Sequence, residues 1–206
     1  MSNPIVGLYN SGIYVRGHDL IVDRWEQEWG LCEYPDDLKN VLHKYEDGGK
    51  VGNTVLDIGA GHKPLSFSLS TPERLILIDA APQILALGKD GKEVIPLWAN
   101  LDTLVDSGSF GFIKDYGPID TIIASSVFNY VNWKKLLYVL ANFHTDGGYL
   151  FIANLIGAGA PFLFSAHRPK SHSEIVETLP NCSYEVIDDI VESNLSMIVA
   201  KKTERL

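Results

Sequence analysis

The residues best placed to do chemistry in this sequence are an aspartate and two glycines in one short segment. The segment Val55–Gly61 places Asp57 near the end of an apolar run, just before Gly59 and Gly61. Glycines let a backbone turn sharply and approach a ligand closely. A helix that starts after such a turn offers free N–H groups and a positive dipole end. An acid beside this turn suits a cationic ligand group better than a phosphate.

The proline that follows the glycine turn argues against a dinucleotide site. Pro64 stands where the third glycine of a G-x-G-x-x-G turn would be, and that glycine permits close helix packing beside a pyrophosphate. A nicotinamide-dependent oxidoreductase shares the pattern of strand, glycine turn, helix and acid, so it stays an alternative. A second alternative is a strand-to-helix turn that binds no ligand.

A second acid ends the next apolar run. Asp79 closes the run Leu75–Ile78 and is followed by Ala80. A carboxylate about 20 residues beyond such glycines can accept two hydrogen bonds from the vicinal hydroxyls of a ribose. An aspartate at a helix start can also act only as an N-cap. Because the first motif is present as well, the ribose role is favoured.

Short apolar runs alternate with helical stretches and position these acids. The runs are nearly all apolar, as expected of parallel strands buried on both faces. The expected strands are Thr54–Ile58, Leu75–Ile78, Val94–Leu97, Ile119–Ala124 and Tyr149–Ala153. The helices expected between them are Pro64–Leu69, Pro82–Leu87, Leu101–Asp106 and Trp133–Phe143. This alternation predicts an α/β fold with a doubly wound, mostly parallel sheet.

The end of the chain changes this pattern. A helix is expected at Ser173–Leu179, then strands at Ser183–Val191 and Leu195–Ala200. The short link between these strands, residues 192–194, can join only an antiparallel pair. The predicted sheet therefore has seven strands, with helices on both faces and a terminal antiparallel hairpin. We expect residues 1–50 to form an N-terminal helical cap or lid and residues 51–206 the Rossmann-like domain.

Composition predicts one ordinary soluble domain. The chain has 206 residues, of which 46% are hydrophobic. No apolar run approaches the roughly 18–20 residues that a membrane span needs, and the first residues lack the features of a secretory signal. Cys32 and Cys182 are the only cysteines, and they suggest neither a disulfide framework nor a zinc site. We expect a cytoplasmic protein with no membrane partner and no metal.

The charge of the chain disfavours a nucleic-acid partner. The formal net charge is −9, whereas a protein that follows a phosphate backbone needs lysines and arginines gathered on one face. The basic clusters here are short: Lys134-Lys135, residues 167–170 and Lys201-Lys202. A small-molecule partner is therefore favoured, and the oligomeric state stays open.

Five motifs in order, over residues 51–202, resemble those of the class I S-adenosylmethionine-dependent methyltransferases. The first motif of that family, D-x-G-x-G, is similar to VLDIGAGHKPLSFSL, and the second is similar to LILIDAAPQIL. The turn after the third strand corresponds to PLWANLDTL, the fourth-strand motif to IDTIIASSVFNYV and the fifth-strand motif to GGYLFIANLIG. The terminal hairpin is also the family's pattern. The resemblance implies a methyltransferase that uses S-adenosyl-L-methionine.

The resemblance also implies which residues bind the donor. Asp57 would contact the amino group of the methionine part, and Asp79 would hold the ribose hydroxyls. Ala80 would touch the adenine, and Asn100 or Asp102 would meet its amino group, for which an asparagine carbonyl can accept the hydrogen bond. The other donor-binding residues would be Gly59, Ala60, Gly61, His62, Leu101, Ser125 and Ser126.

The acceptor site is expected at the ends of the fourth and fifth strands. Methyl transfer from a sulfonium needs orientation, exclusion of water and an unprotonated nucleophile, so a base is needed only for a protonated amine or a hydroxyl. Acceptor contacts in such folds come from strand ends, which favours Asn129, Tyr130 and Asn154. Candidate catalytic residues are Tyr130, His167 and His172. The alternatives are that Tyr130 closes the core and that both histidines are solvated loop residues.

Residues 1–30 are rich in aromatic residues, which a surface arm rarely exposes. We expect this segment to fold over the strand ends, where Tyr14 and Arg16 could reach the carboxylate of the donor. The alternative is that these aromatics pack on a helix far from the cofactor.

The predicted function is transfer of a methyl group to a small-molecule nitrogen or oxygen. A nicotinamide-dependent oxidoreductase and a non-catalytic S-adenosylmethionine-binding protein remain alternatives.

Overall fold

The structure is a computed structural model that describes residues 36–61, 63–155, 169–192 and 195–204. Its strands are β1 (Thr54–Ile58), β2 (Arg74–Asp79), β3 (Glu93–Trp98), β4 (Ile119–Ser125), β5 (His144–Leu155), β6 (Tyr184–Glu192) and β7 (Leu195–Lys202). Its α-helices are α3 (Asp36–Asp47), α4 (Leu101–Ser107), α5 (Trp133–Leu140) and α6 (His172–Thr178). Short 3-10 helices are η1 (Leu65–Ser68), η2 (Pro82–Ala86), η3 (Ser109–Tyr116), η4 (Val127–Asn129) and η5 (Leu179–Cys182).

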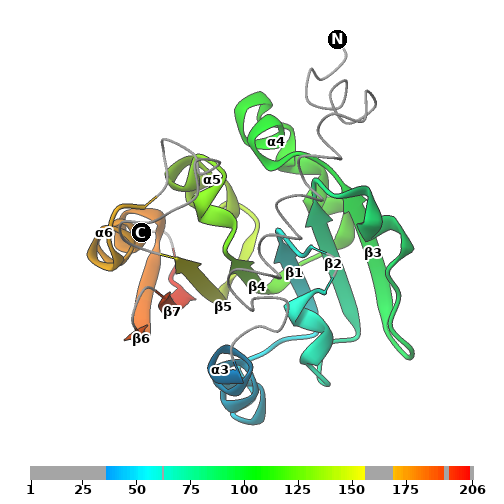
Figure 1. Ribbon diagram of the computed structural model, residues 1–206, viewed down its shortest axis with the longest axis horizontal. Coiled ribbons are helices and arrows are strands. Elements are labelled where there is room, and N and C mark those ends of the chain that lie inside the picture. Colours follow the sequence, from blue (N-terminus) through cyan, green and yellow to red (C-terminus); the bar gives the residue numbers. More distant parts are fainter. Residues whose placement is uncertain (1–35, 62, 156–168, 193–194, 205–206) are drawn as a thin grey trace.

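The strands form one sheet in the order β3-β2-β1-β4-β5-β7-β6 (Figure 1). The pairs among β1 to β5 are parallel, whereas β7 is antiparallel to both β5 and β6. The predicted seven-stranded sheet with a terminal antiparallel hairpin is confirmed. This strand order reverses direction between β1 and β4, so their carboxyl ends flank the crevice where ligands of such sheets bind.

Helices cover both faces of the sheet and bury its alternating side chains. On one face, α4, α5 and α6 pack over residues such as Ile58, Ile122 and Ile152. On the other face, Leu38 and Leu42 of α3 pack in the same cluster as the side chains of β1 and β2 (Figure 1). The end of the N-terminal segment, from residue 36, is therefore part of the domain's core packing.

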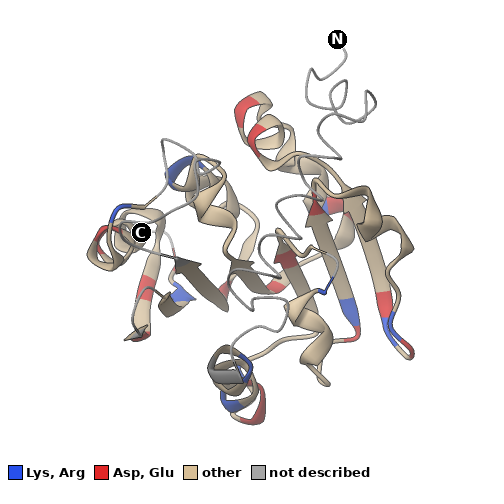
Figure 2. Cartoon of the chain, in the orientation of Figure 1, with Lys and Arg blue, Asp and Glu red and all other residues tan. Residues whose placement is uncertain are grey.

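The charged residues are distributed unevenly along the strands. Figure 2 shows acidic residues at the carboxyl ends of β1 and β2, and a basic residue at the opposite end of β2.

No helix within the described ranges combines the length and the apolar character that crossing a bilayer would need.

Two predicted helices are shorter and tighter than expected. The segments after β1 and β2 form single stretches of 3-10 helix, η1 and η2, instead of α-helices. Each begins at or just after a proline, Pro64 or Pro82, and each is followed by an extended leucine. Proline is tolerated in a first turn but does not by itself sustain a helix. The stretch η3 was not predicted, and it directly follows Gly108, whose left-handed conformation ends α4.

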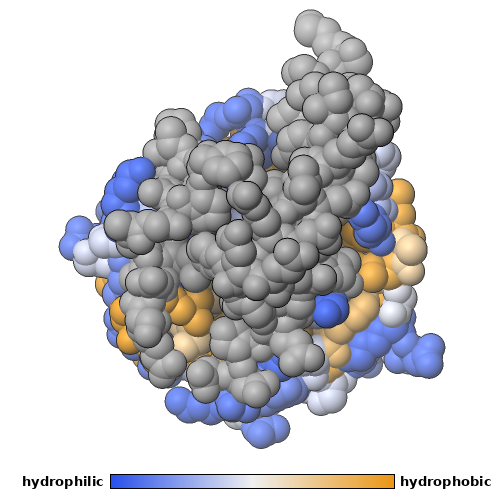
Figure 3. All heavy atoms as spheres, viewed as in Figure 1, coloured by the Kyte–Doolittle hydropathy of each residue, from blue (hydrophilic) through white to orange (hydrophobic). Residues whose placement is uncertain are grey.

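The expectation that every strand is buried on both faces is wrong for β3. This strand lies at the edge of the sheet, and none of its residues is fully buried. Trp98 at its end is 39% exposed, and Leu85 of the neighbouring η2 is 54% exposed. Figure 3 shows the resulting apolar surface along the margin formed by η2 and β3. The short η2 does not cover this edge as a full helix would.

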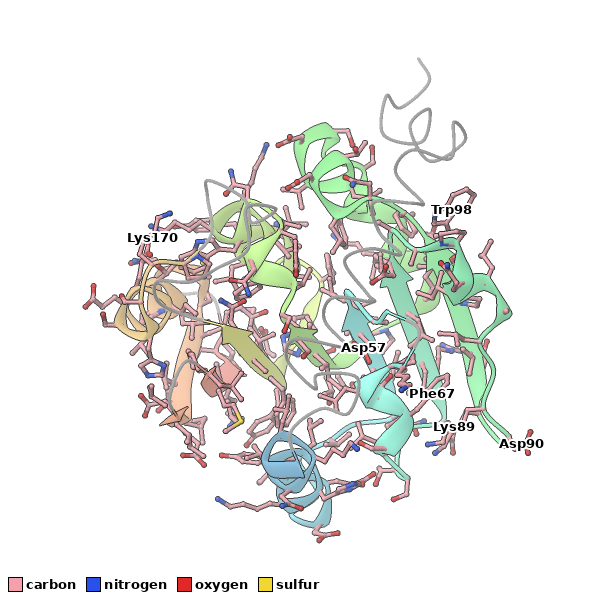
Figure 4. All side chains as sticks on the ribbon, in the orientation of Figure 1. Asp57, Phe67, Lys89, Asp90, Trp98 and Lys170 are labelled. Atoms are coloured by element: carbon pink, nitrogen blue, oxygen red, sulfur yellow. The ribbon has the colours of Figure 1, made fainter. Side chains whose placement is uncertain are left out.

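The segment that contains η1 is held in place by charged side chains. On one side, Oε1 of Glu46 accepts hydrogen bonds from the backbone N–H groups of Ser70 (2.7 Å) and Thr71 (2.6 Å). Burial alone would raise the pKa of Glu46, but these N–H groups lower it to about 2. On the other side, Nζ of Lys89 donates to the carbonyl oxygen of Phe67 at 2.6 Å (Figure 4). These contacts fix the loop that lies next to Asp57.

Candidate functional site

Asp57 is a buried carboxylate at the carboxyl end of β1 (Figure 4). It is 1% exposed, and its Oδ2 accepts a hydrogen bond of 2.9 Å from the backbone N–H of Ser66. Its Oδ1 is buried and has no hydrogen-bond partner among the described residues. Burial raises the pKa of Asp57 to about 6, against the lowering effect of the Ser66 N–H, and the nearby Asp79 raises it further. A cation placed at Oδ1 would stabilise the charged form.

The glycine turn after β1 has the geometry that its sequence predicts. Gly59 and Gly61 have φ values of 69° and 59°, which favour glycine. A Cβ on Gly59 would lie 3.0 Å from Cβ of Val127, so the turn also packs tightly against the end of β4. Around Gly61 no described atom lies within 4 Å of such a Cβ. The side chain of Ala60 is fully buried in the core, so only its backbone faces the turn.

Asp79 ties the two strand ends together. Its Oδ2 accepts a hydrogen bond of 2.9 Å from the N–H of Gly61, and its Oδ1 accepts one of 2.7 Å from the N–H of Ala81. The second bond organises the turn that leads into η2, much as a capping aspartate would. Both bonds come from backbone N–H groups, so the carboxylate of Asp79 stands between the glycine turn and the turn after β2.

The residues after β3 are engaged in local hydrogen bonds. Oδ1 of Asn100 accepts from the N–H (3.0 Å) and the hydroxyl (3.2 Å) of Thr103, and thereby caps α4. Oδ1 of Asp102 accepts from the N–H of Asn132 at 3.0 Å. Leu101 is 6% exposed and its side chain belongs to the core. The side-chain oxygens of Asn100 and Asp102, which were expected to bind the adenine amino group, thus accept hydrogen bonds from groups of the protein.

Trp98 is a residue of this region that the sequence analysis missed. Its Nε1 donates a hydrogen bond of 2.9 Å to the carbonyl oxygen of Ala80, directly after Asp79. The sequence signal was a polar-tipped aromatic at the end of an expected strand. Its role depends on the register that sets Trp98 beside Asp79, and that register is not visible in the sequence.

Two buried asparagines meet at the ends of β4 and β5. Asn129 and Asn154 are both fully buried, and Nδ2 of Asn154 donates to Oδ1 of Asn129 at 3.1 Å. Nδ2 of Asn129 has no partner within the described part of the chain. Ser125 is buried as well, and Ser126 has the left-handed φ of 57° that serine seldom adopts. Tyr130 follows them and packs partly buried against the core.

His172 is not a solvated loop residue, contrary to the alternative considered for it. It begins α6, its Nδ1 lies 2.8 Å from Oγ of Ser196, and its Nε2 lies 2.7 Å from Oδ2 of Asp189. Ser196 is paired across the sheet with Asn154. The ring therefore reaches, through Ser196, the strand position next to Asn154. The other residues named from the sequence, His62, His167, Tyr14 and Arg16, lie outside the described residues.

The structure therefore brings Asp57, the glycine turn, Asp79 and Ala80 together at the ends of β1 and β2. The asparagine pair lies at the ends of β4 and β5 of the same sheet. Within the ranges the structure describes, no group of three histidine, cysteine or acidic side chains could hold a metal ion.

Comparison with known proteins identifies the fold. No family model and no curated protein matches the chain. Among solved structures, a 1,6-didemethyltoxoflavin-N1-methyltransferase of Burkholderia thailandensis, with S-adenosylhomocysteine bound, has a TM-score of 0.66 at 15% identity. The match covers 99% of this chain and 92% of that one. The N-methyltransferase NodS of Bradyrhizobium japonicum has a TM-score of 0.64 at 13% identity, over 85% of this chain and 92% of its own.

A third similar structure has another activity. The [4+2]-cyclase SpnF has a TM-score of 0.55 at 12% identity, over 82% of this chain and 81% of its own. The chain thus has the fold of the class I S-adenosylmethionine-dependent methyltransferases, as the motifs predicted. Because one fold supports several chemistries, activity has to be argued from the site.

Proposed function

We propose that this protein binds S-adenosyl-L-methionine at the carboxyl ends of β1 to β3 and transfers its methyl group to a small molecule. The observation that carries the proposal is the buried Oδ1 of Asp57, which has no partner among the described residues. A buried polar atom without a partner costs about 1–3 kcal/mol, and more when it is charged. The ammonium group of the methionine part matches Oδ1 of Asp57 in charge and in hydrogen-bonding capacity.

The other donor contacts follow from the positions of the strand ends. Asp79 would accept hydrogen bonds from the two ribose hydroxyls while it keeps its bonds to Gly61 and Ala81. Among the described residues, nothing lies within 4 Å of a Cβ built on Gly61, which leaves room for the methionine and ribose. Ala80 and the residues that begin α4 would border the adenine, and His62 and Tyr14 are proposed to add further contacts. The residues present therefore fit the donor.

The asparagine pair is the proposed acceptor site. The donor supplies an activated methyl group, so the protein has to orient the acceptor and exclude water. Asn154 fixes the amide of Asn129, whose Nδ2 can donate to an oxygen or ring nitrogen of the acceptor. Ser125 and Tyr130 would complete this side by hydrogen bonding to the acceptor, and the neutral imidazole of His167 would take up a proton where the acceptor has to lose one. These groups are uncharged in their ordinary states, which favours N- or O-methylation of a neutral small molecule.

Two features support this function over its alternatives. The terminal arrangement β5-β7-β6 is typical of methyltransferases, and Pro64 replaces the third glycine of a dinucleotide-binding turn. A similar structure is that of a [4+2]-cyclase, so a protein of this fold can have another activity. Methyl transfer therefore has to be measured separately from donor binding.

Calorimetry with two ligands tests the donor site. S-adenosylhomocysteine should bind to the full chain, and NAD should show no heat under the same conditions. Binding of NAD with no response to S-adenosylhomocysteine would contradict the proposal. If the donor binds, incubation with methyl-labelled S-adenosylmethionine and a panel of neutral heteroaromatic and hydroxylated small molecules should yield labelled product. Donor binding with transfer only to proteins or nucleic acids would overturn the proposed acceptor class.

A further inference from the structure

The turn after β2 is supported from β3 and not by a helix. In a β-α-β unit, the helix that follows a strand fixes the intervening turn through its first N–H groups. Here that helix is reduced to η2, Pro82–Ala86, whose first residue is a proline without an N–H. The turn that carries Asp79 therefore needs other contacts to hold its shape.

Two hydrogen bonds from the end of β3 supply those contacts. The N–H of Ala99 donates to the carbonyl oxygen of Asp79 at 2.9 Å. The indole Nε1 of Trp98 donates to the carbonyl oxygen of Ala80, also at 2.9 Å. In the parallel register, Trp98 lies directly beside Asp79. The two successive carbonyl groups of the turn are thus held by Trp98, the last residue of β3, and by Ala99, which follows it.

The position of Trp98 is unusual for a residue that only fills the core. Its ring is 39% exposed at the edge of the sheet, above the carboxyl end of β3 (Figure 4). Another large apolar side chain could fill this partly exposed edge position equally well, so packing alone gives no reason for a tryptophan here. An indole N–H that reaches a backbone carbonyl does give such a reason.

We propose that Trp98 is a positioning residue of the ribose site. Its indole N–H holds the carbonyl of Ala80 and so keeps the Asp79 carboxylate aimed at the two ribose hydroxyls. This inference rests on the proposed donor site, and it adds a residue that makes no required contact with the reacting atoms. Because η2 is short, this side-chain hydrogen bond adds support to the backbone hydrogen bonds that hold the turn.

Two substitutions separate the ring of Trp98 from its N–H. Trp98→Phe keeps an aromatic ring and removes the donor. Trp98→Gln removes the ring but keeps a donor, because its Nε2 is the same number of bonds from Cα as the indole Nε1. Leu85→Ala is the matched control, since Leu85 is an exposed apolar residue of the adjoining η2. Each variant is first checked by thermal unfolding, so that binding is compared only between folded proteins.

The readout is calorimetric affinity for two ligands, S-adenosylhomocysteine and 5′-methylthioadenosine. Both contain the ribose, but only the first has the amino acid part. Trp98→Phe should weaken both by the same factor of about three- to tenfold, the effect of one neutral hydrogen bond. Trp98→Gln should recover most of the loss, and Leu85→Ala should bind both as the wild type does. Asp57→Asn should weaken only S-adenosylhomocysteine, because it acts at the amino acid end.

The possible failures are distinguishable. Wild-type protein that binds neither ligand would overturn the donor site itself. Wild-type binding that Trp98→Phe leaves unchanged would overturn the role of Trp98 alone. A loss confined to S-adenosylhomocysteine, or an equal loss in Trp98→Gln and Trp98→Phe, would also overturn it, because the effect would then come from the far end of the site or from the ring.

Discussion

The two ends of the sheet treat their buried polar groups in opposite ways. At the amino end, Nδ1 of His144 lies 3.0 Å from Oη of Tyr184, and Nε2 lies 3.4 Å from the carbonyl oxygen of Asp120. The ammonium group of Lys202, 2% exposed, donates to the carbonyl oxygen of Thr203 at 2.8 Å and lies 3.5 Å from Asp146. Buried groups at this end are matched within the protein, as stability requires.

The carboxyl end keeps buried polar atoms without such matches. Oδ1 of Asp57, Oγ of Ser66 and Nδ2 of Asn129 have no hydrogen-bond partner among the described residues. Unmatched buried polar groups persist where a ligand uses them. The difference between the two ends therefore supports the proposed site at the carboxyl end, independently of any similarity to other proteins.

The largest effect is expected from Asp79, the acid proposed to bind the ribose. Asp79→Ala should weaken binding of S-adenosylhomocysteine by about 2–4 kcal/mol, because it removes hydrogen bonds to a charged group that are each worth roughly 1.5–3 kcal/mol and are not additive. The fold should survive, since Asp79 lies at a strand end. Calorimetry measures the affinity, and circular dichroism checks the fold. An unchanged affinity would show that Asp79 only shapes the turn through Ala81.

A substitution at the amino end of the sheet should change the stability of the protein in acid and not its affinity for the donor. Burial lowers the pKa of His144 to about 4, against 6.5 for the free side chain. The unfolded chain therefore takes up a proton between these values while the folded protein does not, and the stability that His144 contributes is lost as pH falls from about 6.5 to about 4. The loss amounts to about 3 kcal/mol.

The variant His144→Gln isolates this effect. It cannot titrate, so the difference in unfolding free energy between wild type and variant should change across this pH range, as measured by urea denaturation at pH 7 and pH 4.5. Affinity for S-adenosylhomocysteine at pH 7 should be the same in both proteins. A pH-independent difference would contradict the buried neutral state of His144.

The smallest effect compares two serines with the same unusual backbone. Ser126 at the carboxyl end and Ser183 at the amino end have φ values of 57° and 60°. Replacing either by glycine should relieve left-handed strain and change stability by no more than about 1 kcal/mol. Only Ser126→Gly should alter ligand binding or turnover. Equal effects of the two variants on activity would mean that the strain at Ser126 has no functional meaning.

The sequence predicts the strands of this fold well because each strand is a short apolar run bounded by polar residues. The run Thr54–Ile58 is a strand with the same bounds in the structure, and the others differ at their ends. The sequence predicts a helix after β1 and after β2, because both segments are long enough for one. In the structure each segment forms only a single stretch of 3-10 helix, which begins at or just after Pro64 or Pro82. The contacts of Glu46 and Lys89 that fix the η1 segment come from distant parts of the chain.

The residues of the candidate site that lie at strand ends could be predicted from the sequence. The contacts that depend on which strands pair, and in which register, could not. Asp57 and Asp79 could be named because parallel strands bring their carboxyl ends to one edge. The role of Trp98 depends on the register between β2 and β3, and the bond between Asn129 and Asn154 depends on the adjacency of β4 and β5. Neither register nor the pKa of Asp57, which results from its burial, can be read from local sequence.

The most direct test of the account is to measure stability and donor binding together in Asp57→Asn. The pKa of Asp57 is raised from its ordinary 3.8 to about 6, so the folded wild type loses stability as pH rises between these values. The neutral asparagine avoids this cost, which is about 3 kcal/mol at pH 7 and vanishes below about pH 4. Urea denaturation and calorimetry with S-adenosylhomocysteine, both at pH 7, give the two quantities. The account predicts that Asp57→Asn is more stable than the wild type and binds S-adenosylhomocysteine at least about tenfold more weakly. A variant that is less stable, or that binds as tightly as the wild type, would contradict the claim that Asp57 is kept buried and charged for the donor.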